Sequence, residues 1–303
     1  MATSAEAGLG RATTRLLVAG LTLACAAGHR PQRAARRVEC SRRVAALSTL
    51  TTLTASPRLA VAADYDAAFA ASVKFDDSTF YERYPFRVAA DVLSYVEAVG
   101  APGDAQRVLR AMETFGARYP MFAIGPVKGL IVDDIVRRKR PTSVLEVGSF
   151  LGYSAVRIGS QLPKGAAMVC VEASDEFAAT ARRIVAHAGL GSVVDFVVGR
   201  AEDVDLRALA GRFRGGAADL VFLDHCKECY APDLRRLEGA GLVAKGTVVV
   251  ADNVVYPGAP GYLDAVAAPD YATVLRDAPY ESKGWETKWK EVPDAMSVST
   301  RLR

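Results

Sequence analysis

Five short apolar segments alternate with helical patterns between residues 143 and 251, and this alternation constrains the fold more than any other feature. The apolar segments are residues 143–147, 168–171, 193–198, 218–223 and 247–251. Patterns of helical period separate them, at residues 153–162, 175–188, 204–213 and 232–240. Because the apolar segments are almost continuously hydrophobic, helices are expected to cover both faces of each strand. The alternation therefore predicts an α/β fold with a doubly wound parallel sheet, whose ligands lie beyond the carboxyl ends of the strands.

Segments on either side of this core extend the prediction. Three helical patterns precede it, at residues 88–99, 104–115 and 127–138. Asp104 is suited to cap the second of them, and Pro141 ends the third. After the core, residues 271–275 and 296–301 fit two antiparallel edge strands. The complete prediction is a mostly parallel, seven-stranded sheet with helices on both faces.

The first 63 residues differ in composition from the rest of the chain. They contain nine Arg, no Lys and two acidic residues, and they are rich in Ala, Ser and Thr, as transit peptides are. Residues 16–27 form an apolar run that is shorter than the roughly 20 residues of a membrane-spanning helix. Arg42 and Arg43, followed by an apolar segment and the small residues 60–63, resemble a twin-arginine export signal.

These features predict three segments and a location. Residues 1–63 are predicted to be a cleaved organellar presequence, residues 64–87 an irregular, aromatic-rich extension, and residues 88–303 the folded domain. The predicted location is the plastid, with the thylakoid lumen as a final compartment; the mitochondrion and the secretory pathway are the alternatives. Residues 64–303 carry 29 basic and 32 acidic side chains, which argues against a nucleic-acid partner. No stable membrane span is predicted in the mature protein.

The cysteines do not predict a disulfide framework. Cys25 and Cys40 lie in the presequence, which leaves Cys170, Cys226 and Cys229 in the folded domain. A single Cys-x-x-Cys pair without a second pair is a weak zinc signal. Cys226 and Cys229 are compatible either with two cysteines that line a loop or with a regulatory disulfide.

Acidic side chains close most of the predicted strands, so they are expected to meet at one edge of the sheet. Glu146, Glu172, Asp224 and Asp252 end four strands, and buried carboxylates need partners or a metal. A glycine turn at residues 148–152 lets a cofactor approach the backbone, and Glu172 suits the hydroxyls of a ribose. The glycine spacing differs from the G-x-G-x-x-G pattern, so a dinucleotide cofactor is the less favoured alternative.

Oxygen ligands from two neighbouring strand ends favour a divalent cation. Asp224, Asp252 and Asn253 are hard ligands of the kind that Mg²⁺ binds while keeping open coordination positions. Lys227 follows Asp224 by three residues, where a partly desolvated lysine can act as a general base. The alternative is that Asp224 and Asp252 only cap helices.

Residues 88–300 resemble the catechol O-methyltransferases, a cation-dependent family with the Rossmann-like class I methyltransferase fold. The matching stretches are residues 101–104, 124–129, 146–157, 221–225, 241–247 and 251–254. The resemblance implies transfer of a methyl group from S-adenosylmethionine to one hydroxyl of a catechol, a small phenolic substrate, with Mg²⁺ as the metal and Lys227 as the base.

The resemblance also implies roles for individual residues. The implied cofactor-binding residues are Ile124, Glu146, Gly148, Phe150, Tyr153, Ser154, Glu172, Ala173, Gly199, Ala201, Glu202, Asp224 and His225. The implied substrate-binding residues are Phe122, Lys227, Asn253 and Glu286, and the implied Mg²⁺ ligands are Asp224, Asp252 and Asn253.

Departures from the family pattern bear on the substrate. Cys226 stands where the family has a Trp, Phe150 where it has a Tyr, and Ala201 where it has a Ser. Pro120 and Phe122 replace a Trp and a Met that wall the catechol. Either Glu286 or Lys288 occupies the position that holds the second hydroxyl. These differences keep two alternatives open: another phenolic acceptor, such as a phenylpropanoid thioester, or a non-catalytic binding protein with the same fold.

Overall fold

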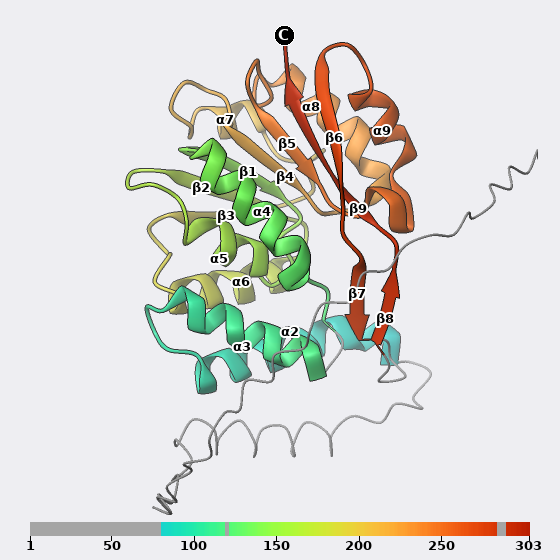
Figure 1. Cartoon of the computed structure of the whole chain (residues 1–303). Coiled ribbons are helices and arrows are strands. Elements are labelled where there is room, and N and C mark those ends of the chain that lie inside the picture. Colours follow the sequence, from blue (N-terminus) through green and yellow to red (C-terminus); the bar gives the residue numbers. More distant parts are fainter. Residues whose placement is uncertain (1–79, 119–120, 284–288) are drawn as a thin grey trace, which may run out of the picture. The chain divides into compact units, whose positions relative to one another are not determined.

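The computed structural model describes residues 80–118, 121–283 and 289–303, all of which belong to one unit, Leu53–Arg303 (Figure 1). The predicted presequence, residues 1–63, lies outside the described residues, as do Pro120, Glu286 and Lys288. In the part of the chain that is described, no helix combines the length and apolar character needed to cross a membrane.

The central sheet has seven strands in the order β3-β2-β1-β4-β5-β9-β6, which confirms the predicted mostly parallel sheet. The parallel strands are β1 (Ser143–Val147), β2 (Ala167–Glu172), β3 (Val194–Val198), β4 (Leu220–Leu223) and β5 (Val248–Ala251). The remaining strands, β6 (Tyr271–Asp277) and β9 (Ala295–Arg301), are antiparallel to their neighbours. The chain proceeds outward from β1 to β3 and then returns to place β4 beside β1, so the crevice for a ligand lies at the carboxyl ends of β1 and β4.

Helices cover both faces of the sheet, as predicted. Alternate strand residues point to opposite faces: Val144 and Phe222 belong to one core cluster, whereas Leu145 and Leu223 belong to the other. The first face is covered by α4 (Gly125–Lys139), α5 (Tyr153–Gly159) and α6 (Asp175–His187). The second is covered by α7 (Leu206–Ala210), α8 (Tyr230–Gly239) and α9 (Pro260–Val266).

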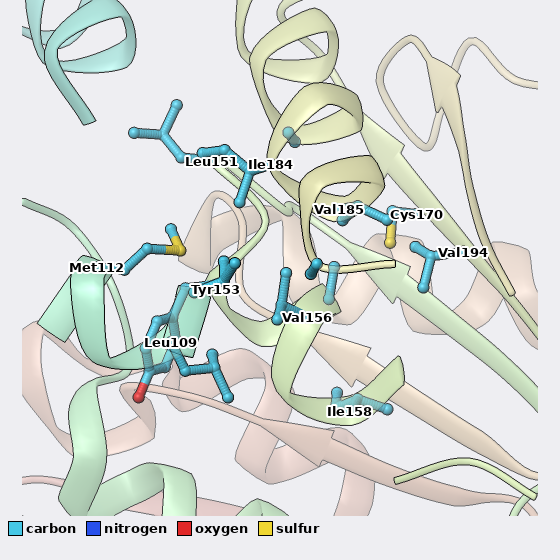
Figure 2. Packing of buried hydrophobic residues seen from close by; sticks show 14 of the residues in the cluster. Leu109, Met112, Leu151, Tyr153, Val156, Ile158, Cys170, Ile184, Val185 and Val194 are labelled. Atoms are coloured by element: carbon cyan, nitrogen blue, oxygen red, sulfur yellow. The ribbon is translucent and has the colours of Figure 1, made fainter. Parts of the chain in front are cut away.

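Two further helices, α2 (Phe80–Val99) and α3 (Ala105–Arg118), pack outside α5 and α6. Figure 2 shows the apolar side chains that join these layers. Leu109 and Met112 come from α3; Tyr153, Val156 and Ile158 from α5; Ile184 and Val185 from α6; Cys170 and Val194 from β2 and β3. The layers therefore share one apolar cluster.

Local sequence signals fix where several helices begin. Ser174 precedes α6, and its side chain accepts a hydrogen bond from the Phe177 amide at 3.2 Å. Asp205 precedes α7 and accepts from the amides of Arg207 and Ala208, each at 3.0 Å. These caps set the point at which the chain turns back from the sheet edge.

Several predicted boundaries were wrong. The segment 64–87 is not irregular throughout, because α2 begins at Phe80; the aromatic residues Phe80, Tyr81 and Tyr84 follow helical spacing. The predicted helix 204–213 is shorter in the structure, where α7 begins after the Asp205 cap and ends at Ala210, and the predicted helix 153–162 ends at Gly159. The helix α9 and the hairpin of β7 (Tyr280–Lys283) and β8 (Trp289–Val292) were not predicted.

The core of the helical layers supplies a stability test. Ile184 on α6 is 0% exposed, so Ile184→Ala leaves a cavity and should lower the free energy of unfolding by about 2–5 kcal/mol. Leu130 on α4 is 66% exposed, so the matched change Leu130→Ala should shift it by no more than about 0.5 kcal/mol. Urea unfolding followed by circular dichroism measures both. Equal destabilisation of the two variants would contradict the packing described.

Candidate functional site

The glycine turn after β1 lies against the segment that follows β4. Gly148 has a φ of +85°, which favours glycine. A Cβ at this position would lie 2.7 Å from the Asp224 carbonyl oxygen and 2.8 Å from the His225 Cβ. Since only a residue without a side chain allows this approach, Gly148 brings the β1 turn and the Asp224 segment together at the sheet edge.

Glu172, at the end of β2, binds the backbone of the same turn. One of its carboxylate oxygens accepts hydrogen bonds from the amides of Ser149 at 3.1 Å and Phe150 at 2.8 Å. The other accepts from the Ser174 amide at 3.0 Å. A carboxylate offers about four lone-pair positions, so capacity remains for a hydroxyl ligand. The amide of Gly199, at the end of β3, donates to the Glu172 carbonyl at 2.9 Å, which brings a third strand end to this place.

Aromatic rings lie beside the turn. Phe150 has a φ of +46°, an uncommon conformation for a residue with a side chain. Its ring centroid lies 6.1 Å from that of Phe122 and 4.8 Å from that of Phe177. Phe122 is 55% exposed, so an apolar surface is available next to the turn. The predicted substrate residue Phe122 and cofactor residue Phe150 are therefore neighbours.

Glu146 lies inside the protein and not at the open edge of the sheet. Its carboxylate is fully buried on the α5 side and accepts hydrogen bonds from the Ser154 hydroxyl and, at 3.0 Å, from the Cys170 thiol. Burial raises the pKa of Glu146 to about 7, and the Ser154 and Cys170 bonds oppose that shift. The predicted cofactor residues Glu146 and Ser154 therefore contact each other.

Tyr153 begins α5, where its hydroxyl bonds a carboxylate and a guanidinium. The hydroxyl donates to Glu113 at 2.7 Å and accepts from Arg157 at 2.8 Å. Ile124, buried at the N-cap of α4, is also among the predicted cofactor residues. For Tyr153 and Ile124, contact with a cofactor stays a prediction.

The segment after β4 holds a lysine against an aspartate. Lys227 Nζ donates to Asp224 Oδ1 at 2.8 Å and to the Tyr230 hydroxyl at 2.7 Å. The Tyr230 hydroxyl lies 2.9 Å from the Leu223 carbonyl oxygen and 3.2 Å from that of Asp252. Tyr230 is fully buried, so it ties Lys227 to the ends of both β4 and β5.

The end of β5 is held by a buried lysine that the sequence analysis missed. Lys128, on α4, is 2% exposed and donates to Asp252 Oδ1 at 2.6 Å and to Asp294 Oδ2 at 2.5 Å. Asp294 also accepts from the Asn253 side-chain amide at 2.9 Å. Lys128 belongs to the glycine-flanked motif 124–129, so a charged residue on an otherwise apolar helix face was the available signal.

The charges at these two strand ends suit a divalent cation. Three carboxylates, Asp224, Asp252 and Asp294, face two ammonium groups, Lys128 and Lys227, which leaves a formal excess of one negative charge. Burial, and next the negative charge of Asp224, raise the pKa of Asp252 to about 6. Among the described residues, no three His, Cys, Asp or Glu side chains form a metal cluster. The predicted set instead has two carboxylates and the Asn253 amide, all oxygen donors.

His225 faces the second layer of helices. Its Nε2 lies 2.8 Å from Asp233 Oδ2, and its ring centroid lies 5.0 Å from that of Tyr230. Its Nδ1 is buried without a hydrogen-bond partner within the described structure. A buried polar atom without a partner is uncommon, so Nδ1 retains an unused capacity for one hydrogen bond.

The last predicted cofactor residues follow β2 and β3. Ala173 is exposed, Ala201 is buried in the core cluster beside α7, and Glu202 forms an ion pair with Arg200. None of these positions gives Ala173, Ala201 or Glu202 a contact that tests its predicted role.

Cys226 and Cys229 form a disulfide, whereas Cys170 is a buried free thiol. The disulfide encloses Lys227 and Glu228, which belong to the 3₁₀ turn Lys227–Cys229. Of the two readings that the sequence left open, the structure has the disulfide.

Comparisons with known proteins identify the family. The family described as O-methyltransferase matches residues 105–274. The mouse catechol O-methyltransferase is 39% identical over 173 residues, which are 57% of this chain and 65% of the mouse protein. The pig catechol O-methyltransferase is 44% identical over 140 residues, which are 46% of this chain and 75% of the pig protein. The chain therefore spans less than two thirds of the length of the mouse protein.

A solved structure extends the comparison to the fold. The O-methyltransferase from Bacillus cereus, in complex with SAH, aligns with 71% of this chain and 99% of its own, with a TM-score of 0.50 and 23% identity. The likeness confirms the predicted class I methyltransferase fold.

The buried carboxyl of Glu146 gives a pH test. In the unfolded chain Glu146 has its ordinary pKa of 4.5, and in the folded protein a pKa of about 7. Between these values the folded state binds more protons, so this group lowers stability as the pH rises through that window. Glu146→Gln removes the effect. Between pH 4.5 and pH 7.5 the unmodified protein should lose about 3 kcal/mol of unfolding free energy that the variant keeps. Urea unfolding of both proteins across this pH range is the measurement. If the unfolding free energies of the two proteins changed with pH in the same way, the raised pKa would not belong to Glu146.

Proposed function

This chain belongs to the O-methyltransferase family, and we propose that it transfers a methyl group from S-adenosylmethionine to one hydroxyl of a catechol-type diol, with Mg²⁺ bound. The observation that carries the proposal is the linked pair of strand ends. Lys227 bonds Asp224 and Tyr230, and Tyr230 bonds the backbone of Asp252. A lysine and two aspartates are therefore held close to each other beside the glycine turn, and this supports their proposed roles as a base and two hard metal ligands.

The cofactor site is proposed from family membership and from the geometry of the turn. The backbone at Gly148 approaches the Asp224 segment, and Glu172 retains capacity to bind the ribose hydroxyls. The unpartnered Nδ1 of His225, the residue that follows Asp224, is proposed to face the adenine end. Ile124, Phe150, Tyr153, Ser154, Ala173, Gly199, Ala201 and Glu202 complete the proposed set.

Asp224, Asp252 and Asn253 are the residues that would hold Mg²⁺. When bound, S-adenosylmethionine supplies a methyl group on a positively charged sulfur, and Mg²⁺ supplies the Lewis acidity that favours ionisation of a nearby hydroxyl. The excess negative charge at these strand ends supports this ligand set. Lys128 and Asp294 hold Asp252 and Asn253 in place through hydrogen bonds.

Lys227 is proposed to accept the proton of the reacting hydroxyl at Nζ. The position of Nζ is set by Asp224 at 2.8 Å and Tyr230 at 2.7 Å, so the side chain is restrained before the acceptor arrives, and the neutral amine is the form that takes the proton. Because the side chain is already ordered, it loses less orientational entropy during the reaction than a mobile base would lose. The exposed ring of Phe122, in contact with Phe150, is proposed to pack on the aromatic acceptor.

One observation favours a different phenolic acceptor. Cys226 stands where the family has a Trp beside the base, and the disulfide to Cys229 fills that position with a compact, non-aromatic group. A phenolic with a larger substituent, such as a phenylpropanoid thioester, is therefore the second candidate. Glu286, the proposed contact for the second hydroxyl, lies outside the described residues.

Metal removal and an acceptor panel test the proposal. With Mg²⁺, the protein should methylate catechol, and EDTA should abolish the activity because the acceptor hydroxyl then stays protonated. Methyl transfer from labelled S-adenosylmethionine is the measurement. Full activity in EDTA would refute the metal role. Turnover of monophenols at the rate of vicinal diols would favour the second candidate, and cofactor binding without transfer to any phenol would indicate a non-catalytic protein.

Replacing the base separates chemistry from binding. Lys227→Met keeps the apolar stem but removes the proton acceptor, so kcat should fall about 10²–10⁴-fold. Affinity for S-adenosylmethionine, measured by calorimetry, should change less than about twofold. Lys245→Met, at an exposed turn, is the matched control and should retain full kcat. Equal kcat for the two variants would exclude Lys227 as the base.

A further inference from the structure

The disulfide between Cys226 and Cys229 lies directly on the segment that carries the proposed base. It spans a Cα–Cα distance of 5.2 Å and closes a ring around Lys227 and Glu228. Nothing in the proposed methyl transfer uses either sulfur. Within the described residues the remaining cysteine, Cys170, is buried in the core, so it is unavailable for exchange with this pair.

The two sulfurs differ in exposure and in environment. Cys226 is exposed, so an incoming thiolate can reach its Sγ. Cys229 is partly buried and is the residue at the N-cap of α8, a helix of 10 residues. Of the two sulfurs, the one at Cys226 is therefore the more accessible to a reductant.

The difference in exposure decides the direction of exchange. An incoming thiolate reaches Cys226 Sγ, so attack at Cys226 with Cys229 as the leaving group is the favoured direction.

We propose that the Cys226–Cys229 disulfide is a thiol–disulfide exchange site, opened by a dithiol reductant, and that its redox state sets how firmly Lys227 is held. The link to catalysis rests on the proposed function of Lys227; the exchange site itself does not. The first thiolate of the reductant bonds Cys226 Sγ, the protein S–S bond breaks, and Cys229 leaves as a thiolate that takes a proton. The second thiol of the reductant then displaces Cys226, so the protein gains two thiols and the reductant becomes a disulfide.

The disulfide bears on Lys227 because it restrains the turn that positions it. The turn Lys227–Cys229 has no buried residue, so packing contributes little to its order. Besides the disulfide, the turn is held by a hydrogen bond from the Cys229 amide to the Cys226 carbonyl at 3.0 Å and by the hydrogen bonds of Lys227 to Asp224 and Tyr230. Tyr230 itself remains fixed by its bonds to the ends of β4 and β5. Reduction therefore loosens Lys227 without moving Tyr230.

The size of the effect follows from the length of the ring. On the chain-entropy estimate, a disulfide that closes a four-residue loop raises the ratio of the ordered to the disordered state of that loop by roughly 20-fold. Because the hydrogen bonds of the turn persist, this is the upper limit. The expected loss of kcat on reduction is about 3- to 20-fold.

The exchange is tested on the full chain, equilibrated in mixtures of oxidised and reduced dithiothreitol. Alkylation of thiols followed by mass spectrometry of the 226–229 peptide counts the two cysteines. Both thiols should appear together, in a single two-electron transition. Free thiols at Cys226 and Cys229 throughout the oxidised mixtures would overturn the proposal.

Two readouts follow in the same mixtures. The rate at which acetic anhydride modifies Lys227 should rise several-fold on reduction, because the amine spends a larger fraction of the time away from Asp224 and Tyr230, and kcat should fall. The control is the double variant Cys226→Ser, Cys229→Ser, which retains every other cysteine. Its Lys227 reactivity and its kcat should match those of the reduced protein and should not respond to dithiothreitol.

The outcomes separate the two proposals. Lys227 reactivity that is equal in the oxidised and reduced protein overturns the positioning role of the disulfide. A redox response in the double variant assigns the effect to another cysteine and also overturns it. If Lys227 reactivity responds to reduction but no methyl transfer occurs in either state, the exchange site stands and the proposed function fails.

Discussion

The ammonium group of Lys128, placed between Asp252 and Asp294, holds together three parts of the protein that are far apart in the sequence. It joins α4 to the end of β5 and to the residue that precedes β9, with the two lysine–aspartate contacts at 2.6 and 2.5 Å. Charges withdrawn from water are costly unless they are paired, and loss of one partner costs about 3–5 kcal/mol in comparable buried pairs. The position of Asp252 and Asn253 therefore depends on α4 being correctly packed, although α4 contributes no acid to the proposed metal site.

The order of the strands explains why the other groups meet at the same place. β1 and β4 are neighbours, so the turn after β1 and the segment after β4 leave the sheet side by side. Gly148 allows them to touch, and Glu172 binds the turn from β2. The proposed cofactor and base are thereby brought to adjacent positions by backbone geometry, before any side chain selects a ligand.

Much of this arrangement was predictable because it depends on local signals. Apolar strands of four to six residues and the acids that follow them are readable from the sequence, and the parallel fold then places Glu172, Asp224 and Asp252 on one edge. The pairing of Lys128 with Asp294, 166 residues apart, has no local signal. Glu146 was predicted from its place near the end of β1, but the alternation of strand residues points it into the α5 layer, where Ser154 and Cys170 bind it. The hairpin of β7 and β8 depends on pairing between segments and was missed for the same reason.

The position of β9 has a consequence for the way the protein is made. β9 lies inside the sheet, between β5 and β6, and Asp294 directly precedes it. During synthesis the ribosome therefore delivers Lys128, Asp224 and Asp252 before the carboxylate that completes their charge balance. A nascent chain that has reached β6 presents an open edge at β5 and a lysine with one of its two partners. The five parallel strands can assemble while translation continues, but the edge that carries Asp252 and Asn253 acquires its final form only when residues 294–301 emerge, so formation of the sheet and completion of the candidate site are separate events in the life of each molecule.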